Sequence, residues 1–219
     1  MSKYLNKNSD NLTLAIYNND NSFCFASREN NNHLSDNFFV KKFENDLCNN
    51  LIIDFAKFIK KENFKRINKI CVCIGPANFN ASRQIIVLAR TLSQQINCPL
   101  DSFSSFELMA KRIAIKNNLY SHKHKKLFWI FKKLKRRGYI AGKYEIYNSE
   151  KTKQVIYIKE KLIPRIFKEL KDTEFSYQAE YNEIEDLKEL LNLSDKNSKK
   201  SNFNRWEKVL PIYPISPIN

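Results

Sequence analysis

The sequence from Ile70 to Ala110 is ICVCIGPANFNASRQIIVLARTLSQQINCPLDSFSSFELMA, and it gives the strongest indication of the fold. The apolar run Ile67–Ile74 predicts a buried strand, and the dipeptide Gly75-Pro76 marks where that strand ends. From Phe79 to Ile96, apolar residues recur at every third or fourth position, which predicts an amphipathic helix. A buried strand followed by a tight turn and a helix is typical of an α/β layer.

The segments on either side of this stretch extend the α/β layer. Leu12–Tyr17 and Ser22–Ser27 are predicted to be two strands of a hairpin, and Phe43–Lys61 is predicted to be a helix. Ser104 or Ser105 is expected to cap a third helix that ends near Lys116. This order of elements is that of a ribonuclease-H-like layer, and we expect residues 1–117 to form one lobe around it.

The second half of the chain has a different pattern, and we expect residues 118–219 to form a smaller α/β lobe with an extended, proline-rich tail. An antiparallel group of strands is predicted over Lys126–Lys133, Tyr139–Tyr147 and Val155–Ile158. Two helices are predicted over Leu162–Leu170 and Tyr181–Leu191.

The composition limits the class of protein. The 219 residues are 42% hydrophobic, which is enough for a real core, and five cysteines in an odd number indicate reduced thiols in a cytoplasmic protein. No stretch approaches the roughly 20 apolar residues of a membrane span, so no membrane association is expected. The net charge of +15 favours an anionic partner such as RNA, although a solvated basic surface explains it equally well.

The quoted stretch resembles the signature of the TsaB (YeaZ) family, in which a buried strand runs into GPGSFTGLR. The residues that keep this pattern are Gly75, Pro76, Phe79 and Arg83, and the downstream residues that match are Ser104, Ser105, Leu108 and Ala110. Arg136, Arg137 and Gly138 resemble a basic hairpin of the family, and the tail Leu210–Tyr213 is similar to its C-terminal element. The resemblance implies an actin-like ATPase, ribonuclease-H-like fold with two small lobes, each a mixed sheet with flanking helices.

The chain also departs from the family pattern. Ala77 and Ala81 stand where the family has glycine, and Asn78 and Asn80 stand where it has a hydroxyl residue. The actin-like ATPase relatives carry an acidic residue at the end of the first strand, and alignment places that position on Asn6, a neutral amide. Because phosphate needs close backbone approach and magnesium needs anionic oxygens, we predict no catalytic residue, no cofactor and no metal.

The resemblance implies a specific role. TsaB-like proteins pair with a TsaD-like subunit that transfers a threonylcarbamoyl group to the adenine 3′ of the anticodon in tRNA, and a TsaE-like ATPase completes the assembly. This chain would be the non-catalytic partner. Two alternatives remain open, namely a free-standing basic RNA-binding module with a degenerate actin-like fold, and a small-molecule kinase or hydrolase of that fold.

Helix periodicity predicts where a partner would bind. At 100° per residue the helix from Phe79 has one narrow apolar stripe facing the sheet, and some apolar residues fall outside it. The preceding helix also has more apolar residues than its core face needs. Together, these extra apolar residues of the two helices predict an interface with a second subunit, either another copy of the chain or the TsaD-like protein. A neighbouring loop could instead cover the surplus. The predicted interface residues are Ile52, Ile59, Arg83, Ile86, Val87, Arg90 and Gln94.

Lys111–Lys143 is a basic segment with twelve lysines or arginines and no acidic residue. Phe128, Trp129, Phe131 and Tyr139 are interleaved with these charges, and such mixtures suit RNA. The other interpretation is that the aromatic residues pack in the sheet while the lysines face water. The acidic segment Glu174–Glu189 could also dock the basic hairpin within the chain. The candidate RNA contacts are Lys132, Lys133, Lys135, Arg136 and Arg137.

Overall fold

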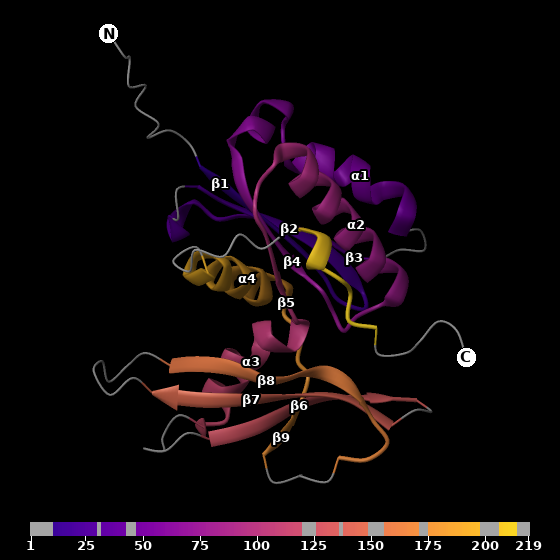
Figure 1. Ribbon diagram of the computed structural model, residues 1–219, viewed down its shortest axis with the longest axis vertical. Helices are drawn as coiled ribbons and strands as arrows, with labels where there is room; N and C mark the ends of the chain where they lie inside the picture. The colour runs from indigo at the N-terminus through magenta and orange to yellow at the C-terminus, as the bar shows by residue number, and fades with distance from the viewer. Residues whose placement is uncertain are drawn as a thin grey trace.

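A computed structural model describes residues 11–29, 32–42, 47–119, 126–135, 138–148, 156–170, 175–197 and 206–213 of the chain. These residues form two sheets with helices packed on them (Figure 1). Within the described part of the chain, no helix is long and apolar enough to cross a membrane.

The first sheet has five strands in the order β3-β2-β1-β4-β5. The strands are β1 (Leu12–Asn18), β2 (Ser22–Glu29), β3 (Asn37–Lys42), β4 (Ile67–Cys73) and β5 (Leu100–Phe103). β1, β2 and β3 are antiparallel neighbours, whereas β1, β4 and β5 run parallel. The sheet is therefore mixed, as expected for a ribonuclease-H-like layer, but β3 was missed because its residues are only partly buried.

Helices cover both faces of the first sheet. α1 (Leu47–Phe58) and α2 (Phe79–Ile96) lie on one face, and α4 (Glu183–Asn197) lies on the other (Figure 1). Because side chains alternate along a strand, Leu14 and Ile16 of β1 pack toward α1 and α2, while Ala15 and Tyr17 pack toward α4. The sheet thus forms the middle of a three-layer sandwich.

The second sheet has four strands in the order β8-β7-β6-β9. Its strands are β6 (Lys126–Leu134), β7 (Gly138–Asn148), β8 (Ile156–Phe167) and β9 (Ser176–Gln178). The helix α3 (Ser105–Lys116) packs on one face of this sheet through a core that includes Phe106, Met109, Phe128, Ile130 and Tyr144. Ser104 caps α3 by accepting a hydrogen bond from the Glu107 N–H, which confirms the predicted start of that helix.

The predicted helix over Leu162–Leu170 is wrong, because these residues continue strand β8 as far as Phe167. Pro164 removes a hydrogen-bond donor from any helix there, and the alternating burial of β8 matches a strand paired with β7. The predicted helix over Tyr181–Leu191 exists, but it begins at Glu183 and extends to Asn197.

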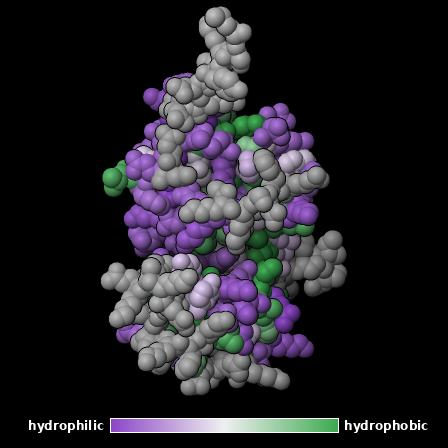
Figure 2. Space-filling model, turned by 60° about the vertical axis from the view of Figure 1, so that its left-hand side comes forward, coloured by the Kyte–Doolittle hydropathy of each residue, from purple (hydrophilic) through white to green (hydrophobic). Residues whose placement is uncertain are grey.

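The chain crosses between the two sheets twice. α3 follows β5 of the first sheet and packs on the second, whereas α4 follows β9 of the second sheet and packs on the first. Apolar side chains gather at the waist between the two halves on the face shown in Figure 2. The lobe boundary between residues 117 and 118 stays a prediction.

Candidate functional site

We call the loop that follows β4, residues 74–78, the motif loop. Hydrogen bonds from Ser105 and Tyr181 hold it on one side. Gly75 has a φ of +92°, a backbone conformation that residues other than glycine rarely adopt. Its carbonyl accepts a hydrogen bond from the Ser105 N–H at 2.7 Å. The next carbonyl, of Pro76, accepts from the Ser105 hydroxyl at 3.0 Å and from the Tyr181 hydroxyl at 3.2 Å. The loop is therefore tied to the start of α3 and to the segment before α4.

The C-terminal tail packs against the other side of the motif loop. The Ile212 N–H donates to the Ile74 carbonyl at 2.8 Å, and a Cβ at Gly75 would lie 3.4 Å from the Ile212 carbonyl oxygen. The rings of Phe79 and Tyr213 have centroids 4.9 Å apart. Two predicted motif residues, Gly75 and Phe79, thus contact the tail rather than an open cleft.

The first amides of α2 are already occupied. The Asn78 side chain caps the helix by accepting hydrogen bonds from the N–H groups of Asn80 and Ala81. A phosphate at this helix start would need those same amide groups. The Asn78 cap therefore competes with any anion for these amides.

The hairpin between β1 and β2 is filled by a carboxylate from α4. Glu183 accepts hydrogen bonds from the Asn19 amide at 3.1 Å and from the Ser22 hydroxyl at 3.0 Å. Although burial raises the pKa of Glu183, hydrogen bonds from its own N–H, Asn19 and Ser22 hold that pKa below its usual value. A negative charge at the mouth of the hairpin opposes the binding of a phosphate there.

The end of the first strand is also neutral. β1 begins at Leu12 and ends at Asn18, whose side-chain amide donates to the Ser82 hydroxyl at 3.2 Å. The position predicted for the acidic residue, Asn6, lies outside the described residues. The end of this strand therefore offers a neutral amide rather than an anionic oxygen that could hold a metal ion.

A buried network joins α4 to the first sheet and to α3. Asp186 accepts from the Tyr17 hydroxyl at 3.0 Å and from the Asn182 N–H at 3.0 Å, and it pairs with Arg112 at 2.8 Å. Burial raises the pKa of Tyr17, and it raises the pKa of Asp186 despite these hydrogen bonds. The network spans β1, α3 and α4, so it fixes the elements around the motif loop.

A partly buried pair of carboxyl groups, Glu107 and Glu160, lies between α3 and the second sheet. Glu160 of β8 accepts from the Ser104 hydroxyl at 2.8 Å and from the Tyr144 hydroxyl at 3.1 Å. Burial and the nearby Glu160 raise the pKa of Glu107 to about 8, and burial also raises the pKa of Glu160. Sequence reasoning missed this pair because its members are distant in the chain and carry no shared motif.

The described residues contain no group of three or more histidine, cysteine or acidic side chains placed to hold a metal ion. Burial raises the pKa of Cys24 and of Cys73 to about 12, and of Cys98 to about 11. These thiols are therefore protonated and unreactive at neutral pH.

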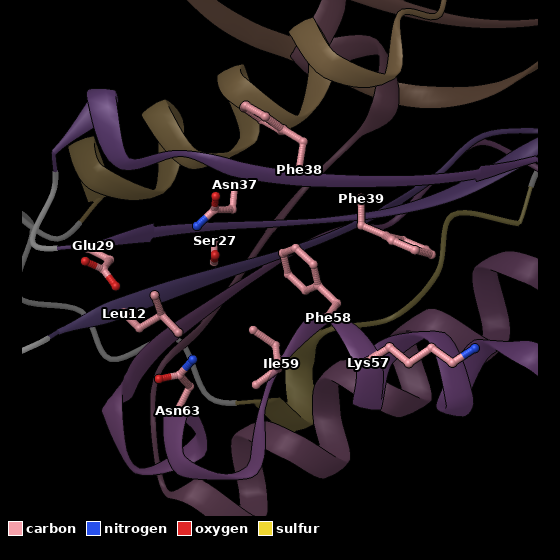
Figure 3. A pocket seen from close by; sticks show the side chains of 10 residues that line it. All are labelled: Leu12, Ser27, Glu29, Asn37, Phe38, Phe39, Lys57, Phe58, Ile59 and Asn63. Carbon is pink, nitrogen blue, oxygen red and sulfur yellow. The ribbon is translucent and has the colours of Figure 1, made fainter.

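A pocket of about 390 Å³ lies at the opposite end of the first sheet from the motif loop (Figure 3). Leu12, Phe39, Phe58 and Ile59 form an apolar wall, and Glu29 and Lys57 are among the charged residues that line the pocket. Among the described residues that line it, none is a histidine or cysteine, and Ile59 is the one predicted site residue.

The outer face of α1 and α2 carries part of the predicted interface. Ile52 is 58% exposed and Val87 is 57% exposed, although both are large apolar residues. They line a groove of about 680 Å³ between the two helices, together with Leu51, Asn80, Arg83, Gln84, Leu88 and Thr91. Gln94 is exposed farther along α2, and the guanidinium of Arg90 lies 5.4 Å from the centroid of the Trp206 ring.

Two residues of the predicted interface do not face outward. Ile86 is 2% exposed and Ile59 is 3% exposed, and both belong to the core of the first sheet. The expected orientation of Ile86 was wrong because α2 also contacts α1 and the short 3₁₀ helix Trp206–Lys208, which widens its buried arc. Ile59 follows the last residue of α1 and turns back into the core.

The candidate RNA contacts do not form one surface. Lys132 forms an ion pair with Asp20 of the first hairpin and lies near the Tyr181 ring. Lys133 and Lys135 are exposed, and because neighbouring strand residues point to opposite faces, Lys133 faces away from Lys132. Arg136 and Arg137 lie outside the described residues.

The acidic segment docks basic residues of α3. Glu180 pairs with Lys116 at 2.8 Å, and Asp186 pairs with Arg112 at 2.8 Å. Sequence reasoning considered the basic hairpin as the internal partner of this segment, but the pairs involve α3.

Comparisons with known proteins identify the architecture. No protein-family model matches the chain, and no curated protein matches its sequence. A solved structure of an uncharacterized protein with similarity to peptidase YeaZ, from Pseudomonas aeruginosa, aligns with a TM-score of 0.68 at 10% identity, covering 94% of this chain and 100% of that one. YeaZ from Pseudomonas aeruginosa aligns with a TM-score of 0.62 at 11% identity, covering 93% of this chain and 99% of that one. The chain has a YeaZ-like fold.

At these identities the likeness concerns the fold alone. It confirms the predicted α/β class with two mixed sheets and flanking helices. The YeaZ-like alignments extend over 94% and 93% of the chain.

Proposed function

We propose that this chain is a non-catalytic partner subunit that supports a TsaD-like transferase in threonylcarbamoylation of the adenine 3′ of the anticodon in tRNA. The proposal joins the YeaZ-like fold to the TsaB-like motif of the sequence. In this role the chain shapes and stabilises the catalytic subunit, and a TsaE-like ATPase completes the assembly.

The observation that carries the proposal is the apolar groove between α1 and α2. Ile52 and Val87 expose more than half of their side-chain surface there, next to Leu51 and Leu88. Exposed apolar residues gathered in one groove are typical of a surface that a partner covers. Arg83 and Gln84 line the same groove and give it polar contacts.

The state of the motif loop supports a role without catalysis. Asn78 occupies the first amides of α2, Glu183 occupies the β1–β2 hairpin, and the tail at Ile212 and Tyr213 packs on the loop. The Asn78 side chain accepts hydrogen bonds from the helix-start amides that a bound phosphate would use, and the Glu183 carboxylate would repel a phosphate beside the hairpin. The chemistry is therefore assigned to the partner.

Co-expression of the full chain with a TsaD-like subunit tests the proposal. Size-exclusion chromatography with light scattering should show a stable heteromeric complex in place of the free chain. Two separate peaks at micromolar concentrations would contradict it, and a homodimer that excludes the TsaD-like subunit would assign the groove to a second copy of this chain.

A further inference from the structure

The second sheet has one face without a packed helix among the described elements. α3 covers the face that carries Phe128, Ile130 and Tyr144, all of which are fully buried. Because strand residues alternate, Trp129 and Phe131 of β6 point to the other face, with Lys143 and Ala141 of β7 beside them in register. We call this second surface the outer face of the second sheet.

Aromatic rings are arranged across this outer face. Trp129 and Phe167 meet edge to face with centroids 5.5 Å apart, and Phe131 and Tyr139 do so at 5.8 Å. Farther along the strands, Tyr147 and Tyr157 are stacked at 5.4 Å. All of these rings are only partly buried or exposed, so each leaves some ring surface to solvent. A pocket of about 460 Å³, lined in part by Phe131 and Tyr139, lies beside these rings.

Cations lie among these rings. The Lys143 ammonium is 5.0 Å from the centroid of Trp129, and the Arg165 guanidinium is 5.1 Å from that of Phe167. The basic residues of the face are Lys133, Lys143, Lys159, Lys161 and Arg165. Its acidic residues are Glu145, which pairs with Lys161 at 3.8 Å, and Glu169 beside that pocket. The face therefore has a positive excess.

We propose that the outer face of the second sheet binds single-stranded RNA. Unpaired bases can stack on partly exposed aromatic rings, while lysine and arginine side chains between the rings contact the phosphates. A duplex keeps its bases stacked inside, so it cannot use these rings. An apolar protein surface would leave the cations of the face without counter-charges.

The choice of RNA over DNA rests on the proposed function, because a subunit that works on tRNA meets an unpaired anticodon loop. The stacking and charge pattern of the face does not depend on that function. Binding of RNA by the isolated chain and association with a TsaD-like subunit are separate measurements, so either proposal can fail without the other.

Fluorescence anisotropy of the full chain with a labelled 12-nucleotide RNA of mixed sequence tests this inference. Trp129→Ala and Phe167→Ala should each weaken binding by about five- to 150-fold, the range typical of losing one base–aromatic stack. Tyr213→Ala is the matched control, because Tyr213 is an exposed aromatic residue of the tail, away from this face. It should leave the affinity unchanged.

Charge provides a second readout that does not depend on the aromatic variants folding. The double variant Lys143→Ala and Arg165→Ala should flatten the log–log dependence of affinity on salt by about 1.4, because each phosphate contact on a single strand contributes about 0.7. Lys57→Ala with Lys188→Ala removes the same charge from α1 and α4 and should leave the slope unchanged.

The inference is overturned if the chain binds no RNA at low salt, or if the face variants bind like their controls. Binding of duplex RNA as tightly as single-stranded RNA would overturn the stacking mechanism. Equal affinity for single-stranded DNA of the same sequence would overturn the assignment to RNA.

Discussion

Replacing Asp186 with alanine is expected to destabilise the chain strongly. Asp186 is fully buried at the start of α4 and holds three donors, namely the Tyr17 hydroxyl, the Asn182 N–H and the Arg112 guanidinium. Alanine removes both carboxylate oxygens, so it leaves these donors without their acceptor. One of them, the Tyr17 side chain, is also fully buried and cannot turn to water.

The magnitude follows from the burial of the network. Removing one member of a buried ion pair costs about 3–5 kcal/mol. The Arg112 side chain is 28% exposed and also donates to the Glu180 carbonyl, so we expect the lower part of that range, about 3 kcal/mol. For a chain of this size each kcal/mol lowers Tm by about 2–4 °C, which gives a loss of about 6–12 °C.

Thermal and urea unfolding followed by circular dichroism measure this loss. Glu185→Ala is the control on the same helix, because Glu185 is exposed and pairs only with Lys188 among the described contacts. It should cost less than about 1 kcal/mol. Asp186→Asn keeps one acceptor oxygen and should fall between the two. If Asp186→Ala were as stable as Glu185→Ala, the network would not be what fixes α4 to the first sheet.

Two further predictions concern protonation and nucleotide binding. The pKa of Glu107, about 8 in the folded chain against its usual value of 4.5, means that the folded chain keeps a proton that the unfolded chain releases. The stability that this group contributes is complete below pH 4.5 and falls as pH rises toward about 8. In Glu107→Gln, the urea midpoint of unfolding should therefore vary less with pH between 5.5 and 8.5 than in the unmodified chain. An unchanged pH dependence would exclude this carboxyl as its cause. Calorimetric titration of the chain with ATP and magnesium should detect no binding, because Asn78 already accepts hydrogen bonds from the first amides of α2 and Glu183 places a negative charge at the β1–β2 hairpin. Low-micromolar affinity would refute that interpretation.

The first half of the fold could be predicted from local patterns. Ile67–Ile74, the turn at Gly75 and the helix from Phe79 have strong periodicity and clear boundaries, and the structure contains each of them. The sequence predicted a hydroxyl cap at Ser104 or Ser105, because a hydroxyl before an apolar helix has one dominant use, and the structure assigns the cap to Ser104.

The parts of the fold and of the candidate site that the sequence did not predict depend on contacts between residues distant in the chain. The apolar residues of β8 are compatible with helix or strand, and pairing with β7 decides between them. Ile86 is buried because α1 and the 3₁₀ helix Trp206–Lys208 both contact α2, which no periodicity within α2 can reveal. Glu183 and Asp186 meet β1 and the first hairpin only after the chain has passed through the second sheet.

The proposed association through the α1–α2 groove is tested most directly by Val87→Glu. A glutamate there would place a carboxylate in the covered groove, one helical turn from Arg83, at a cost of about 3 kcal/mol or roughly 150-fold in affinity. Ile115→Glu is the matched control, since Ile115 is a 44% exposed isoleucine on α3, outside the groove. In a quantitative pull-down with a TsaD-like subunit, we predict that Val87→Glu is folded but does not associate, while Ile115→Glu associates like the unmodified chain. An intact complex with Val87→Glu, or equal loss with both variants, would contradict the proposed function.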